Sequence, residues 1–151
     1  IVSMIKPRVN KFSDIAPLAS FFLAGMLELS SVDFAHKQLE PEQVRKVLQF
    51  TLWRLEALRH WHKDHIFTAV NQLATAMDIK PKHVFAILFV AITGSTASVS
   101  VFDAMAHLGP DISRARLRHG VTVLGGLSNK EAKRWDKAYR QLAIQSGMLA
   151  I

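Results

Sequence analysis

Apolar side chains recur every three or four residues along most of this chain, and this spacing constrains the fold more than any other feature. The clearest segment is 41–60, whose regularly spaced positions are Val44, Val47, Leu48, Thr51, Leu52, Leu55 and Leu58. Such spacing places the side chains on one face of an α-helix. The alternation expected of a β-strand is confined to residues 121–123. The pattern therefore predicts an all-α fold, a helical bundle of roughly seven to eight helices.

Capping and helix-breaking residues divide the periodic segments. Pro81 can open a helix, because the first helical turn accepts proline. Ser100 with Asp103, and Ser128 with Glu131, have the spacing of capping boxes, in which each residue's side chain caps the other's backbone N–H. The helices are predicted to cover 41–60, 64–77, 81–92, 101–108, 111–119 and 129–144, with two more within 1–12 and 13–23.

The composition points to a binding module with an anionic partner. Nineteen lysines and arginines against twelve aspartates and glutamates give a formal net charge of +7. A cationic excess favours polyanions such as nucleic acid or an anionic membrane surface. The chain has no cysteine, which excludes disulfides and thiolate metal sites. Its longest apolar runs are too short to span a bilayer, so we expect no membrane segment.

Two segments resemble chemical motifs but lack the residues that the chemistry needs. The small polar run at 94–100 has no Gly-Lys-Ser/Thr following a strand, as a P-loop requires, and is expected to be an interhelical turn. The run at 59–65 holds His60, His62 and His65, whereas a zinc site needs three or four converging ligands. We expect a solvated turn in which His62 or Asp64 caps the next helix, with no metal site and no catalytic residues.

Three cationic clusters are candidates for contact with nucleic acid. Lys130, Lys133, Arg134, Lys137 and Arg140 fall within about 120° of one face of the predicted helix 129–144. Arg114, Arg116 and Arg118 form a second cluster, and Lys6, Arg8 and Lys11 form a third. Such cations would make nucleic-acid binding salt dependent, and the alternative is an ordinary solvated surface. The predicted phosphate contacts are Arg114, Arg116, Lys130, Lys133, Arg134 and Lys137.

A set of motifs keeps its order and spacing within the segment from about Met4 to Leu117. It comprises Trp61 with Ile66, Asp78-Ile-Lys80, Val90-Ala-Ile-Thr93-Gly94, Phe102, Leu108-Gly109 and Arg116-Leu117. The set resembles the C-terminal anticodon-binding region of bacterial glutamyl-tRNA synthetases. The resemblance implies two small helical subdomains, at 1–77 and 78–119, and leaves 120–151 as a C-terminal helical extension.

The resemblance also implies what the chain binds. It predicts a cytoplasmic monomer that recognises the anticodon loop of glutamate tRNA, with glutamine tRNA as a further candidate. Glutamate would be ligated by a catalytic body outside this sequence, which uses ATP and magnesium, and no cofactor is expected in the chain itself. Arg8 matches an arginine that inspects the third anticodon base and favours glutamate tRNA, with Lys6 as the alternative. The predicted anticodon-binding residues are Arg8, Lys6, Lys11, Phe89, Ser98 and Val101.

Some features depart from that family, and two other functions stay open. Phe89 stands where the family commonly has an arginine, so one RNA contact is expected to be lost. The alternative function is a helical protein-interaction or scaffold domain with a basic surface. A helix-turn-helix DNA-binding module ranks lower, because no recognition helix follows a turn of three to four residues.

Overall fold

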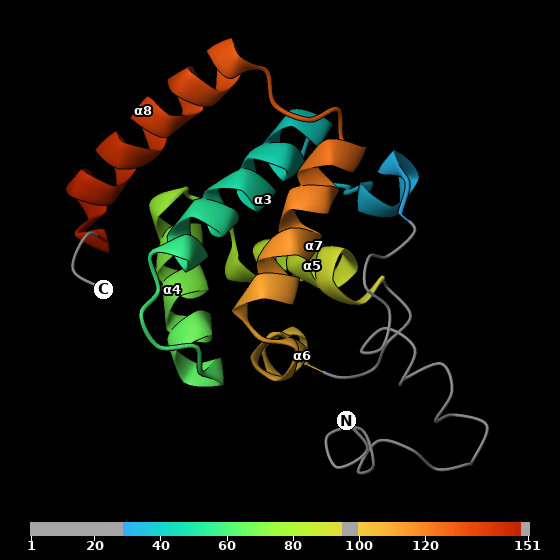
Figure 1. The fold of residues 1–151 in the computed structure, drawn as a ribbon. Coiled ribbons are helices and arrows are strands. Elements are labelled where there is room, and N and C mark those ends of the chain that lie inside the picture. The colour runs from blue at the N-terminus through green and yellow to red at the C-terminus, as the bar shows by residue number, and fades with distance from the viewer. Residues whose placement is uncertain (1–28, 95–99, 149–151) are drawn as a thin grey trace.

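A computed structural model describes residues 29–94 and 100–148, and every element assigned within these ranges is helical (Figure 1). The elements are the 3-10 turn η2 (Ser31–Phe34) and the α-helices α3 (Pro41–Glu56), α4 (Lys63–Ala76), α5 (Pro81–Thr93), α6 (Val101–Leu108), α7 (Pro110–Val123) and α8 (Asn129–Ser146). The all-α prediction is confirmed. The described residues hold six α-helices, slightly fewer than the expected count, and the helices expected within 1–12 and 13–23 lie outside the described ranges.

One helix runs past the end predicted for it. The segment 111–119 was expected to stop before Gly120, yet α7 continues to Val123. A Cβ atom added at Gly120 would lie 3.0 Å from Cδ1 of Leu48 and 3.2 Å from Cζ of Phe34. Glycine therefore allows the close packing of α7 against α3 and η2 without displacing these side chains, and it does not end the helix.

The capping residues occupy the predicted positions, but the acidic side chain of each predicted capping box binds a distant cation instead. Ser100 precedes α6 without a capping bond from its side chain, and Asp103 pairs instead with Nζ of Lys63 at 3.2 Å. Ser128 precedes α8, and its Oγ accepts a hydrogen bond of 3.1 Å from the backbone N–H of Glu131. The Glu131 carboxylate does not complete the capping box, because Arg45 binds it.

The main apolar core is built around α3. Figure 1 shows α3 and α7 near the middle of the bundle, with α4 and α6 toward its lower end. Core residues come from η2 and from each of α3 to α7, including Val47, Leu88 and Leu117. This core includes residues on both sides of position 78, and the division into subdomains at 1–77 and 78–119 stays a prediction. None of the described helices combines the length and the apolar character needed to cross a membrane.

A second, smaller cluster attaches α8. Trp135 and Ala143 of α8 pack with Phe50 of α3 and Leu73 of α4. Below this cluster the buried guanidinium of Arg54 donates hydrogen bonds to the carbonyl oxygens of Ala69 and Met148 and to the Gln72 side chain. Burial lowers the pKa of Arg54, and these acceptors compensate the buried cation. Arg54 thus joins α3, α4 and Met148, two residues beyond the end of α8.

Replacing Gly120 by isoleucine tests the close approach of α7. The added side chain must displace Leu48 and Phe34, so we expect the free energy of unfolding to fall by about 1–3 kcal/mol. Thr122→Ile is the matched control, because Thr122 is exposed on the same helix and is expected to change stability by less than about 0.5 kcal/mol. Urea unfolding followed by circular dichroism measures both, and equal losses would contradict the packing.

Candidate nucleic-acid interface

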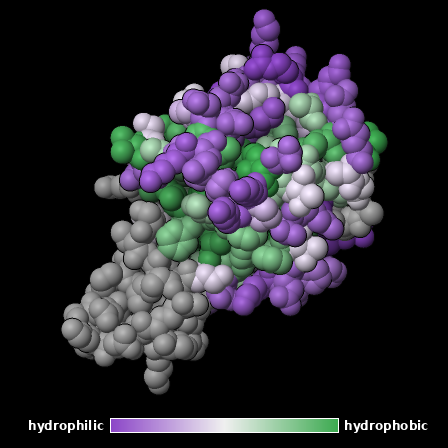
Figure 2. All heavy atoms as spheres, turned by 180° about the vertical axis from the view of Figure 1, so that it is seen from behind, coloured by the Kyte–Doolittle hydropathy of each residue, from purple (hydrophilic) through white to green (hydrophobic). Residues whose placement is uncertain are grey.

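The long C-terminal helix α8 carries the largest exposed group of cations predicted from the sequence. Lys130, Lys133, Arg134, Lys137 and Arg140 are all exposed, whereas Trp135 on the opposite face is 3% exposed. Seen from behind in Figure 2, hydrophilic side chains project along the top and upper right of the molecule, where α8 lies. The predicted two-sided character of this helix is therefore present in the structure.

The cations of α8 differ in whether an acid neutralises them. Arg134 lies 3.6 Å from Oε2 of Glu131, and Nε of Arg140 lies 3.1 Å from Oδ2 of Asp136. Within the described residues, Lys130, Lys133 and Lys137 form no ion pair. These three lysines therefore carry charge that an external phosphate can bind. The ion pairs of Arg134 and Arg140 are exposed and weak, so a phosphate could replace the acid in each of them.

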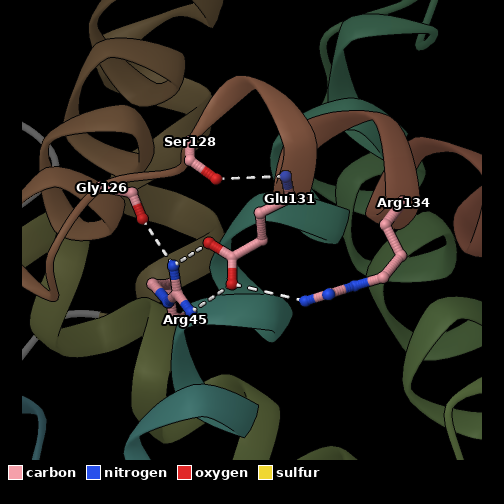
Figure 3. Close-up of polar contacts among 5 residues, drawn as sticks. All are labelled: Arg45, Gly126, Ser128, Glu131 and Arg134. Carbon is pink, nitrogen blue, oxygen red and sulfur yellow. Dashed lines mark hydrogen bonds and ion pairs between the residues drawn. The ribbon is translucent and has the colours of Figure 1, made fainter.

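Arg45 of α3 holds the start of α8 in place (Figure 3). Its guanidinium binds both carboxylate oxygens of Glu131, at 2.5 and 3.0 Å, and donates a 2.6 Å hydrogen bond to the carbonyl of Gly126. The same guanidinium lies 4.8 Å from the ring centroid of Trp135. A bidentate arginine–carboxylate pair fixes direction as well as distance, so it sets the angle at which α8 leaves the preceding turn.

The Arg45 pair also sets the charge state of Glu131. The hydrogen bonds from Arg45 lower the pKa of the Glu131 carboxyl, and the charges of Arg45 and Arg134 act in the same direction. Partial burial opposes them and does not reverse the shift. Glu131 thus stays ionised and offsets one cation at the first turn of α8, where an acid also suits the helix dipole.

The arginines of α7 do not form one cationic surface. Arg116 is 1% exposed, and its guanidinium donates a 2.6 Å hydrogen bond to the carbonyl of Ile92 in α5. Because a buried guanidinium has no surface to offer a phosphate, we remove Arg116 from the predicted phosphate contacts. Arg114 is half-buried, donates to the carbonyl of Leu55 at 2.9 Å and lies 5.6 Å from the Trp61 ring. Its role as a phosphate contact stays a prediction.

Two of the predicted anticodon-binding residues lie within the described part of the chain. Val101 begins α6 and is 6% exposed, and Phe89 packs partly buried against the main core near the end of α5. Ser98, Arg8, Lys6 and Lys11 lie outside the described residues. Figure 1 shows α8 at the opposite edge of the bundle from α6. Among the described candidates, Val101 of α6 is therefore not clustered with the lysines of α8.

Sequence reasoning missed that Arg45 positions α8 through its pair with Glu131. Arg45 and Glu131 are 86 residues apart, so no local spacing links them.

The three histidines of the α3–α4 turn, His60, His62 and His65, are exposed. The ring centroid of His65 lies 5.8 Å from that of His60 and 5.6 Å from that of His62. His62 precedes α4 as expected but makes no capping bond with its side chain. Among the described residues, no group of three or more acids or histidines is placed to hold a metal ion.

Glu131→Gln tests the ion pair that positions α8. The ordinary pKa of Glu131 is 4.5, and the folded protein lowers it. The pair therefore stabilises the fold fully above about pH 4.5 and loses this contribution as the pH falls through the lower folded pKa. We expect the stability difference between the native chain and Glu131→Gln, measured by urea unfolding from pH 7 to pH 3, to shrink on acidification. The exposed Glu42→Gln is the control, and parallel pH profiles for the native chain and Glu131→Gln would contradict the assignment.

Comparison with known proteins identifies the family. The family model described as an anticodon binding domain matches residues 1–121. The chain is 60% identical over 142 residues to a glutamate–tRNA ligase of Marinomonas sp. (strain MWYL1) and 51% identical over 144 residues to that of Marinobacter nauticus. These alignments cover 94% and 95% of the chain, yet the chain spans 29% of each relative's length. The chain belongs to the anticodon binding domain family.

Proposed function

We propose that the chain is the C-terminal, anticodon-binding part of a glutamate–tRNA ligase and binds the anticodon loop of glutamate tRNA. The match of the family to residues 1–121 carries this proposal, and the similarity to curated ligases narrows it to glutamate. Ligation with ATP and magnesium would belong to the part of the relatives that this chain does not span. A cytoplasmic monomer is the corresponding proposal for location and assembly.

The residues fit the two tasks of such a domain at two places. Recognition of unpaired loop bases needs edge hydrogen bonds and stacking surfaces, which we assign to Arg8 and to the junction of α5 and α6. Phosphates of the adjoining stem need only positive charge, which the three lysines of α8 without ion pairs supply. Because α8 lies at the opposite edge of the bundle from α6, its contacts are expected to add affinity without base preference.

Titration of the 151-residue chain with fluorescently labelled glutamate tRNA tests the proposal. We expect binding that weakens when any anticodon base is changed and that falls as salt rises. Glutamine tRNA serves as the competitor that reports discrimination. Binding that ignores both the anticodon and the salt concentration would favour the alternative, a protein-interaction domain with a basic surface.

Arg8→Gln tests the residue assigned to the third anticodon base. A guanidinium can donate two parallel hydrogen bonds to a base edge, which is worth about 1–3 kcal/mol of discrimination. We expect the substitution to reduce the affinity ratio between glutamate tRNAs that differ only in this base by roughly tenfold. Lys37→Gln removes an exposed cation that is not assigned to the anticodon and is the control. An unchanged ratio in Arg8→Gln would overturn the assignment, and a changed ratio in Lys6→Gln would move it to Lys6.

Replacing Lys130, Lys133 and Lys137 together by alanine tests the phosphate contacts of α8. The three side chains are exposed, so the fold is expected to stay intact. In a plot of the logarithm of the binding constant against the logarithm of the salt concentration, each lost phosphate contact should reduce the magnitude of the slope by about one. The reduction should be the same for every anticodon variant of the tRNA. The control removes Lys37, Lys63 and Lys82, which are exposed on other elements. An unchanged salt slope in the α8 variant would show that α8 does not touch the tRNA.

A further inference from the structure

A groove separates α8 from the turn between α4 and α5. Its volume is about 750 Å³. The described residues that line it come from the segment before α3, from α3, from the α4–α5 turn with the adjoining ends of α4 and α5, and from α8. Phe89 and Val101, the described residues among those proposed to read the anticodon, do not belong to this lining.

The floor of the groove is mainly aliphatic. Leu39, Met77, Ile79, Ala138 and Leu142 are each partly exposed there, whereas Phe50 is 2% exposed and offers no open aromatic face. An aliphatic floor accepts leucine-like side chains, while single-stranded bases are bound by stacking on aromatic rings. The floor thus favours an apolar peptide side chain over a nucleobase.

Positive charge collects along the side of the groove formed by α3 and α5. Lys46 and Lys80 line it, and so does His83 in the first turn of α5, where the helix dipole is positive. Among the described residues of the lining, Asp78 is the one acid. Partial burial lowers the pKa of His83, and the neighbouring His36, Lys82 and Lys80 lower it further, as expected where cations crowd together. An occupant must therefore bring negative charge to this side.

The α8 wall of the groove supplies the apolar side chains of Ala138 and Leu142. At 100° per residue, Lys133 lies about 140° from Ala138 and about 180° from Leu142 around α8, so it faces away from the groove. The positive charge beside the aliphatic floor therefore comes from Lys46 and Lys80.

We propose that this groove binds an acidic amphipathic helix of a partner protein, whose apolar face rests on the aliphatic floor while its carboxylates meet Lys46 and Lys80. Charge complementarity selects an acidic partner, and the floor selects a helix with apolar residues at every third or fourth position. The groove and the three lysines assigned to tRNA phosphates share the helix α8, and the apolar lining residues Ala138 and Leu142 are not among those lysines.

Selection from a ribosome-display library of random 16-residue peptides on the immobilised 151-residue chain tests the proposal. We expect enriched peptides to carry apolar residues at three-four spacing with aspartate or glutamate between them. The most enriched peptide, labelled with a fluorophore, should bind the double variant Lys46→Glu/Lys80→Glu at least tenfold more weakly than the native chain, because like charges would then face each other. Leucine-to-glutamine changes in the peptide should weaken it similarly.

Lys133→Glu is the matched control, with one charge reversal on the face of α8 that points away from the groove. Lys133→Glu should bind the peptide with an affinity within about twofold of that of the native chain. If the double variant unfolds, the single variant Lys80→Glu replaces it in the test. The proposal would be overturned if the selection enriched no acidic amphipathic sequence, or if the native chain and Lys80→Glu bound the peptide with equal affinity. Displacement of the peptide by a 16-residue oligouridine would overturn it too, because it would make the groove an RNA surface. None of these outcomes depends on the tRNA titration.

Discussion

Two arginines of α3 attach α8 at both of its ends, and the functional surfaces described above depend on this attachment. Arg45 binds Gly126 and Glu131 at the start of the helix, and Arg54 binds the carbonyl of Met148 just after it. Between them the rings of Phe50 and Tyr139 meet at 5.3 Å. Arginine contacts with several acceptors at once fix orientation more strictly than apolar packing alone. The lysines of α8 consequently face solvent in one defined direction.

Local signals in the sequence predicted the helices well because each depends on neighbouring residues. Apolar periodicity, Pro41 and Pro81 in first turns, and Gly109 between α6 and α7 all act within one or two turns of chain. The positions of Ser100 and Ser128 before their helices follow from the same local chemistry. The predicted hydrogen bonds that would return from the Asp103 and Glu131 carboxylates to these serines did not form, because the distant cations Lys63 and Arg45 bind the two carboxylates. The sequence pattern gives no means of weighing such long-range competition.

The arginines of α7 show where more of the site could have been predicted. Arg114, Arg116 and Arg118 are two residues apart, so successive members are about 200° apart around a helix and cannot share one face. The structure indeed buries Arg116 and exposes Arg118. Which arginine turns inward, however, depends on the carbonyl of Ile92 near the end of α5, and that partner is visible only once the helices are packed. Gly120 is similar, because its need for close approach to Leu48 comes from tertiary packing.

Because α8 forms one wall of the groove, the groove exists only while the Arg45–Glu131 pair and the Arg54 contacts hold that helix against α3. The cations that face solvent and the aliphatic floor beside them are thus fixed by the same attachment. A partner helix in the groove would contact Ala138 and Leu142 directly. Because it could bind only while α8 is packed against α3, its binding would stabilise that packed state of α8. A tRNA phosphate on the outer lysines of α8 would favour the same arrangement from the other side. Occupation of either surface is therefore expected to strengthen the other without any change in the core around α3.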